Sequence, residues 1–225
     1  MSMHISNRNG GAKRPATMLS ALAALATAFA MAPVAAQHEH HQHHAQQAKD
    51  AAKPVAPQRA TFKLTETPLV DQEGRTQKFK SEALGDRIAV VSFVYTTCTT
   101  VCPVVSAVMA QVQGQLGARL GRDVALVTVT VDPVRDTPAR LKAYGASLGA
   151  GAGWTWLTGP KPQVDEVLKV FGAYTPNFTE HPALVVVGDA KSGKWLRFYG
   201  FPSSDQLTAA VNELTAARVK AGVAG

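Results

Sequence analysis

The chain has 225 residues, of which 46% are hydrophobic and 17% are charged, and its formal net charge is +7 at neutral pH. Three of the basic residues (Arg8, Lys13 and Arg14) lie in an N-terminal segment without acidic residues, so the rest of the chain carries 7 − 3 = +4. This mild surplus, without clusters of basic and aromatic residues, argues against nucleic acid as a partner.

Residues 1–36 have the layout of a secretory signal. The basic residues precede the apolar run MLSALAALATAFAMAPVAA, which ends in small residues at Val34 and Ala36. We expect cleavage after Ala36 and a periplasmic or otherwise exported protein; left uncleaved, the same run is long enough to anchor the domain in a membrane. The remaining 225 − 36 = 189 residues suffice for one hydrophobic core and not for two ordinary domains.

Residues 37–60 have no apolar periodicity and are expected to form a disordered tail and a proline-containing linker. The tail concentrates imidazole side chains at His38, His40, His41, His43 and His44. Imidazole is the commonest metal-binding side chain and is mostly unprotonated at neutral pH, so we predict a weak secondary metal site here. The alternative is a solvated polar tether.

The folded domain is expected to span residues 61–225. A hairpin that turns at Glu73 and Gly74 is predicted to open it, followed at 87–95 by the continuous apolar and β-branched run of a buried central strand. A helix is predicted to begin beyond Pro103, because a proline in the first helical turn has no N–H that would otherwise need a partner.

The second half of the domain continues this alternation. Further strands are predicted at 123–131, 154–159, 183–189 and 194–201, and helices at 137–148, 162–172 and 203–220. The last two strands are joined by a turn at Ser192 and Gly193. Strands that alternate with helices and close with an antiparallel pair and a helix predict an α/β fold: a thioredoxin-like central sheet flanked by helices, with an added N-terminal β-hairpin.

Both cysteines of the chain lie in YTTCTTVCP, residues 95–103, between the buried strand and the helix. The exposed N–H groups and the dipole of a helix N-terminus favour thiolate over thiol, so Cys98 and Cys102 are expected to be reactive. An inert disulfide is the ordinary expectation for an exported protein. It is disfavoured here because closing so small a loop removes little entropy from the unfolded chain.

Two active classes remain for Cys98 and Cys102, a redox-active dithiol and a metal site. Two thiolates select Cu(I) or Zn(II), and two thiolates with one imidazole suit copper as Cu(I) or Cu(II). His181 is the one histidine outside the signal and the tail. In thioredoxin-like folds the loop before the corresponding strand packs against the redox-active turn, so we expect His181 to face the two cysteines.

Several motifs resemble, in order, those of the Sco/SenC family of copper-delivery factors for cytochrome c oxidase assembly. FVYTTCTTVCP is similar to the family's C-x-x-x-C-P site, VTVDPVRDTPARLKAYG to its D-P-x-R-D-T block, and EHP stands where the family has its ligand histidine. The resemblance extends from about Thr61 to Ala217. It implies that Cys98, Cys102 and His181 bind copper on a thioredoxin-like fold, in an exported and usually membrane-facing location.

The sequence therefore predicts an exported copper chaperone rather than an enzyme, with a copper-accepting client such as the copper subunit of a terminal oxidase. The alternative is a thiol-disulfide reductase that keeps a client's copper-ligand cysteines reduced. A peroxiredoxin-like peroxidase is disfavoured because Tyr95 stands where that chemistry wants threonine.

Two further features are interpreted as architecture. In VDPVRDTP, Thr137 is a natural helix N-cap, and Arg135 can pair with Asp132 or Asp136. A supporting role near the metal is the alternative for this block. Trp154, Trp156 and Trp195 are expected to be packing residues.

Overall fold

The computed structural model describes residues 54–222. The expected signal and the five tail histidines lie outside the described residues, so the expectations about them stay predictions. Within 54–222, no helix combines the length and the apolar character that crossing a bilayer requires.

An eight-stranded sheet forms the centre of the domain, in the order β1-β8-β7-β4-β5-β6-β2-β3. The middle of the sheet is made of β4 (Ile88–Val94), β5 (Val124–Thr130), β6 (Trp154–Thr158) and β7 (Leu184–Asp189). β4, β5 and β6 run parallel, and β7 pairs antiparallel with β4. All seven residues of β4 are buried, as its continuous apolar run predicted, and all seven residues of β5 are buried as well.

Shorter strands complete both sides of the sheet. β2 (Pro68–Asp71) and β3 (Thr76–Lys78) pair antiparallel, and β2 joins the edge of β6. Gly74 adopts a positive φ of 80° in the turn between them, a conformation that glycine reaches without strain. On the other side, β8 (Lys194–Tyr199) pairs with β7 and with β1 (Gln58–Ala60).

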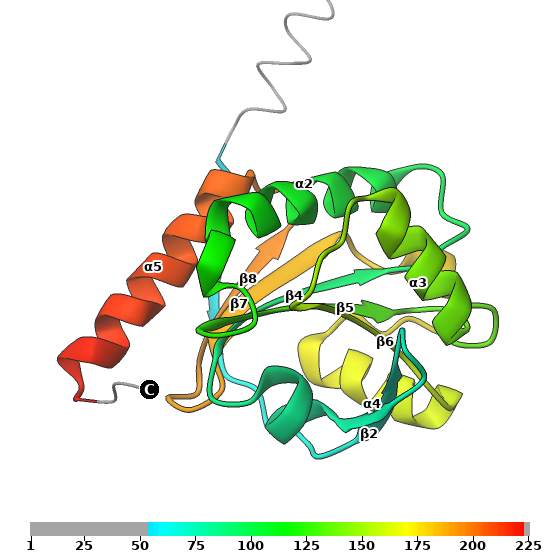
Figure 1. Ribbon diagram of the computed structural model, residues 1–225, viewed down its shortest axis with the longest axis horizontal. Coiled ribbons are helices and arrows are strands. Elements are labelled where there is room, and N and C mark those ends of the chain that lie inside the picture. The colour runs from blue at the N-terminus through cyan, green and yellow to red at the C-terminus, as the bar shows by residue number, and fades with distance from the viewer. Residues whose placement is uncertain (1–53, 223–225) are drawn as a thin grey trace, which may run out of the picture. The chain divides into compact units, whose positions relative to one another are not determined.

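Helices cover both faces of the sheet (Figure 1). One face carries α2 (Val101–Leu116), α3 (Pro138–Ser147) and α5 (Ser204–Lys220). The other face carries α4 (Lys161–Phe171) and the short π-helix η1 (Phe79–Leu84). Two 3-10 turns, η2 (Gly117–Arg119) and η3 (Phe178–Glu180), lie in connections. The predicted α/β fold, a thioredoxin-like sheet flanked by helices, is confirmed.

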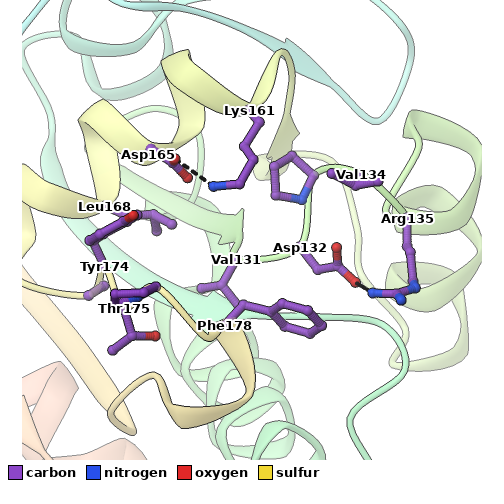
Figure 2. A pocket seen from close by; sticks show the side chains of 13 residues that line it. Val131, Asp132, Val134, Arg135, Lys161, Asp165, Leu168, Tyr174, Thr175 and Phe178 are labelled. Carbon is purple, nitrogen blue, oxygen red and sulfur yellow. Dashed lines mark hydrogen bonds and ion pairs between the residues drawn. The ribbon is translucent and has the colours of Figure 1, made fainter.

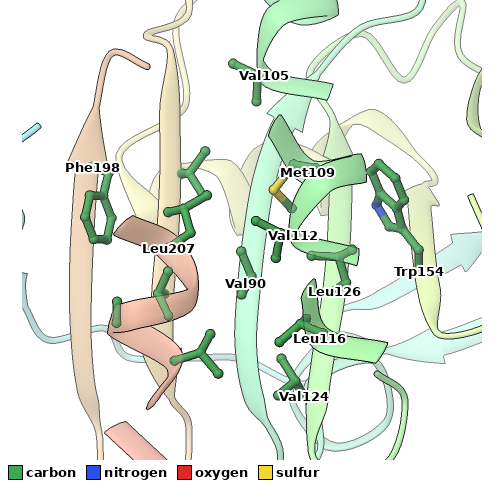
Figure 3. Close-up of a cluster of buried hydrophobic side chains, with 14 of the residues drawn as sticks. Val90, Val105, Met109, Val112, Leu116, Val124, Leu126, Trp154, Phe198 and Leu207 are labelled. Carbon is green, nitrogen blue, oxygen red and sulfur yellow. The ribbon is translucent and has the colours of Figure 1, made fainter. Parts of the chain in front are cut away.

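The core is divided by the sheet into two layers, because side chains alternate along each strand. Val90 of β4 faces α2 and α5, where it packs in the cluster of Met109, Leu126 and Leu207 (Figure 3). Its neighbour Val91 faces α4. All three tryptophans are buried as predicted. Trp154 and Trp156 stack in the layer that contains Val90, and Trp195 lies in the layer that contains Val91.

The N-terminal boundary of the domain is corrected by the structure. Residues 58–60 were expected in the linker, but they form β1 and pair with β8. Val55 is also held, because its N–H and its carbonyl oxygen bond to the side-chain amide of Gln206 at 3.3 and 2.9 Å. The sequence gives no sign of this strand, since three residues, two of them exposed, show no alternation and are held by main-chain pairing.

Candidate metal centre

The two cysteines lie where β4 gives way to α2. Cys98 is in the connecting turn and Cys102 is in the first turn of the helix, which begins at Val101. Both are free thiols, and their exposed fractions are 7% and 1%. The N–H of Cys98 donates to the carbonyl oxygen of Tyr95 at 3.2 Å, so the turn is closed by its own main chain. The expected position between a buried strand and a helix N-terminus is therefore the observed one.

The surroundings of the two thiols differ. Burial raises the pKa of Cys98, but hydrogen bonds from the side chain and N–H of Cys102 and from Thr100 outweigh it and lower this pKa to about 7. Burial, together with the hydrogen bond to Cys98, raises the pKa of Cys102 to about 12. The pair therefore consists of one thiol that ionises near neutral pH and one that stays protonated and donates to it.

His181 follows η3 and precedes β7, and 7% of it is exposed. Its Nδ1 lies 3.1 Å from the carbonyl oxygen of Pro182, which identifies Nδ1 as the protonated nitrogen. Burial lowers the pKa of His181 below its ordinary value, although the Pro182 carbonyl raises it, so the ring is neutral at pH 7. Nε2 is then an acceptor, and it is buried without a hydrogen-bond partner among residues 54–222.

Tyr95 connects the histidine with the cysteines. Its ring meets the His181 ring edge to face, with centroids 5.9 Å apart, and it packs against the core layer that contains Cys98 and Cys102. Burial and the neighbouring Cys98 thiol raise the pKa of Tyr95 to about 12. The ring also meets Phe178 edge to face at 5.1 Å.

The predicted assembly of Cys98, Cys102 and His181 is only partly present. Among residues 54–222, no three histidine, cysteine, aspartate or glutamate side chains are grouped closely enough to hold a metal ion. The imidazole of His181 lies beside one part of Tyr95 and the thiols beside another, so the imidazole and the thiols are not grouped together. The thiols lie on residues 95–102, called the cysteine turn below, and the imidazole lies on residues 173–183, so the two halves come from segments that are far apart in the chain.

Residues 131–136 (VDPVRD), called the VDPVRD loop below, approach the cysteine turn from β5. The interpretation of Thr137 as an N-cap is confirmed, since its Oγ1 accepts from the N–H of Arg140 at 3.3 Å. Arg135 pairs with Asp132 at 3.0 Å. Asp136 instead accepts hydrogen bonds from Thr96, forty residues earlier, and no local pattern could have indicated this contact.

A cavity of about 290 Å³ opens beside the VDPVRD loop (Figure 2). Its lining is mostly apolar, and it holds two ion pairs, Asp132 with Arg135 and Lys161 with Asp165. Phe178 forms part of its wall. Since Phe178 also contacts Tyr95, the cavity adjoins the group of aromatic rings that surrounds His181.

Comparison with known proteins identifies relatives over most of the domain. A protein of Stutzerimonas stutzeri whose name concerns copper binding is 36% identical over 104 residues, which are 46% of this chain and 49% of that protein. The chain thus spans about half the length of this curated relative. The solved SCO1/SenC family lipoprotein of Bacillus anthracis str. Ames is 25% identical, with a TM-score of 0.60 over 72% of this chain and 99% of that one.

The fold is shared with ScoI of Bradyrhizobium japonicum, solved with copper bound, at 23% identity and a TM-score of 0.50, over 72% of this chain and 99% of that one. The family model described as SCO1/SenC matches residues 56–215, which is well over half of the chain. The chain therefore belongs to the SCO1/SenC family.

Proposed function

We propose that this protein is a copper chaperone, which holds one copper ion through Cys98, Cys102 and His181 and delivers it to a client protein by exchange of ligands. The observation that carries the proposal is the presence of two free thiols at one turn and, across Tyr95, a neutral buried imidazole with an unpartnered nitrogen. The copper-binding name of the Stutzerimonas stutzeri relative supports the same cargo.

The donor set fits copper. Thiolates are soft ligands that select Cu(I), and the addition of an imidazole suits Cu(II) as well. A buried nitrogen without a partner costs about 1–3 kcal/mol, so Nε2 of His181 gains a favourable contact when it meets a metal ion. Because the three groups are not yet assembled, copper binding requires the 173–183 segment and the cysteine turn to approach each other.

The chemistry of transfer follows from the number of ligands. Cu(I) is satisfied by two thiolates, so Cys98 and Cys102 suffice for it, whereas Cu(II) prefers nitrogen and a higher coordination number and recruits His181. An incoming thiolate or imidazole of the client then displaces one protein ligand at a time. No change of oxidation state is needed in this exchange.

The proposed client is the copper subunit of a terminal oxidase, because the Sco family is one of cytochrome c oxidase assembly proteins. The proposed location is the periplasm or another exported compartment. Its support is the signal-like sequence of residues 1–36, and the protein would work at the membrane surface if that segment stayed attached.

A second candidate function is reduction of a client's disulfide, favoured by the different pKa values of Cys98 and Cys102. The Cys98 thiolate would attack the client disulfide and form a mixed disulfide, releasing one client thiolate. Cys102, after passing its proton to the released client thiolate, would then attack Sγ of Cys98 and expel the second client thiolate, leaving a Cys98–Cys102 disulfide and a reduced client. Two electrons pass to the client in this sequence.

One experiment tests the proposal and separates it from the alternative. Cu(II) added to the reduced protein should give intense thiolate-to-copper absorption, which Cys98→Ser and Cys102→Ser should abolish and the exposed control Thr99→Ala should retain. Copper transfer to a purified client domain is then measured beside reduction of a model disulfide by the copper-free protein. Absorption that survives both cysteine variants would refute the site, and fast reduction without transfer would favour the reductase.

A further inference from the structure

We propose that the VDPVRD loop is the element that sets the relative position of the two halves of the site: Asp136 fixes the cysteine turn, and Arg135 holds the His181 segment through Phe178. The contacts of Asp136 with Thr96 and of Arg135 with Phe178 are made between protein groups alone. Their importance for copper binding rests on the proposed function.

Asp136 is the anchor on the cysteine side. It is 1% exposed, and its carboxylate accepts from the N–H of Thr96 at 3.1 Å, from the Thr96 hydroxyl at 2.5 Å and from the Thr130 hydroxyl at 2.6 Å. Thr96 lies two residues before Cys98 in the turn, and Thr130 ends β5. The carboxylate therefore ties the cysteine turn to the end of the neighbouring strand.

Arg135 is the anchor on the histidine side. Its guanidinium carbon lies 5.7 Å from the centre of the Phe178 ring, within the range of a cation–π contact. Phe178 begins the 3-10 turn that ends at Glu180, and the N–H of His181 donates to the carbonyl oxygen of Phe178 at 3.3 Å. Arg135 therefore contacts the residue whose main chain is hydrogen-bonded to the main chain of His181.

The VDPVRD loop, which carries both anchors, is held by its own hydrogen bonds. The N–H groups of Arg135 and Asp136 both donate to the carbonyl oxygen of Asp132, at 3.2 and 2.9 Å. The N–H of Asp132 donates to the Thr130 hydroxyl at 3.0 Å, and its carboxylate, 3% exposed, pairs with Arg135. Asp136 and Arg135 are adjacent in this hydrogen-bonded loop. One element therefore contacts both the cysteine turn and the segment that carries His181.

This arrangement predicts different effects for the two anchors. Loss of the Asp136 contacts should loosen the cysteine turn and weaken both Cu(I) and Cu(II), since both use the thiolates. Loss of the Arg135 contact should weaken Cu(II) alone, since only Cu(II) needs the imidazole. Partners that orient metal ligands are typically worth about 10–100-fold in affinity.

The test of the Asp136 anchor uses Asp136→Asn, Thr96→Val and the conservative Thr96→Ser. In the copper-free protein, hydrogen exchange at the Thr96 N–H should accelerate in Asp136→Asn relative to the control Asp165→Asn, which lies on α4. Cu(I) affinity should fall about 10-fold or more in Asp136→Asn and Thr96→Val, and Thr96→Ser should restore it. The double variant should lose less than the sum of the single losses, because both changes remove the same contact.

The test of the Arg135 anchor compares Arg135→Ala and Phe178→Leu with Arg140→Ala, which removes an equal charge from an exposed position of α3. Both variants should weaken Cu(II) about 10-fold and change the nitrogen couplings in its electron paramagnetic resonance spectrum, while Cu(I) affinity matches that of Arg140→Ala. Equal loss of Cu(I) and Cu(II) would overturn the assignment of Arg135 to the histidine side.

The outcomes also separate this inference from the proposed function. Unchanged Thr96 exchange and unchanged copper affinity in Asp136→Asn would overturn the role of the loop while leaving the chaperone intact. Absence of copper binding by the unaltered protein would refute the proposed function, and the exchange measurement would still decide whether Asp136 fixes the turn. Thr96→Val serves both readouts if Asp136→Asn does not fold.

Discussion

The N–H of Cys102 donates a hydrogen bond to Sγ of Cys98 at 3.3 Å. The helix that carries one cysteine thereby stabilises the anionic form of the other. A pair arranged in this way has an outer thiolate that meets incoming ligands first and an inner thiol that follows, which is useful both for stepwise metal exchange and for disulfide chemistry.

The first prediction concerns the order of reaction of the thiols. In the reduced, copper-free protein, iodoacetamide should modify Cys98 before Cys102, and the rate should rise as the pH increases through about 7, since the thiolate is the nucleophile. Mass spectrometry after timed quenching measures both sites. Earlier modification of Cys102, or a rate that rises only near the ordinary thiol pKa of ~8.5, would contradict this prediction.

The second prediction concerns His181. His181→Ala should leave Cu(I) affinity nearly unchanged and weaken Cu(II) by about 10–100-fold, because two thiolates satisfy Cu(I) and Cu(II) wants nitrogen. Competition titrations with a chelator for each oxidation state measure the two affinities. The matched control is His38→Ala, which removes one imidazole from the tail. Equal losses for both ions, or none for either, would remove His181 from the ligands.

The sequence could predict those parts of the fold that have a local signal. The apolar runs of β4 and β5 mark the buried centre of the sheet, and the start of α3 is signalled by the Thr137 cap. β1 has no such signal, because it is held by the main chain of β8. The six-residue π-helix η1 also escaped sequence reasoning, since six residues are too few for a helical period to be recognised.

The candidate site divides in the same way. The position of Cys98 and Cys102 follows from their place between a buried strand and a helix, and both fall within one turn. The distance from this turn to His181 depends instead on Tyr95, Phe178 and the VDPVRD loop, which meet only in the folded chain. Such contacts between distant segments leave no periodic trace in the sequence.

The third prediction concerns a buried ion pair remote from the site. Asp189 ends β7 and pairs with Arg218 of α5, with exposed fractions of 2% and 10% for the two side chains. Removal of one partner from a buried pair typically costs about 3–5 kcal/mol, so Arg218→Ala should lower the free energy of unfolding at pH 7 by about that amount. The exposed pair Arg122–Asp123 provides the control, since solvent screens it and Arg122→Ala should leave the free energy of unfolding nearly unchanged.

The pH dependence of this loss has a definite sign. Burial raises the pKa of Asp189, but hydrogen bonds from Arg218, Ser192 and the N–H of Lys191 outweigh it, so the folded-state pKa lies below the ordinary value. The stabilisation is therefore complete above the unfolded-state pKa of ~3.9 and is lost as the pH falls through the lower folded-state pKa. Urea unfolding of both proteins at neutral and strongly acidic pH should show the difference shrinking in acid. A difference that grows in acid would contradict this assignment.

The fourth prediction separates the tail from the folded site. A mature chain shortened to begin at Gln46 lacks His38, His40, His41, His43 and His44. Calorimetric copper titration should show one tight equivalent in both proteins and additional weak equivalents only with the tail, because a chain segment that must be ordered on binding holds metal less tightly. The weak equivalents should fade below the histidine pKa of ~6.5, while the thiolate site persists further into acid. Loss of the tight equivalent would make the tail a ligand donor to the main site, and absence of the weak ones would make it a tether.

The pairing of β1 with β8 and the bonds of Val55 to Gln206 determine where a segment that precedes the domain acts on it. β1 covers the outer hydrogen-bonding edge of β8, so a chain cut at Thr61 would leave that edge open to pairing with another molecule. Tension applied through the preceding segment would act along β1 and would be resisted first by the bonds of Val55 to Gln206 and by the β1–β8 pairing. A tether attached here pulls on the margin of the sheet, four strands away from β5 and the loop that follows it.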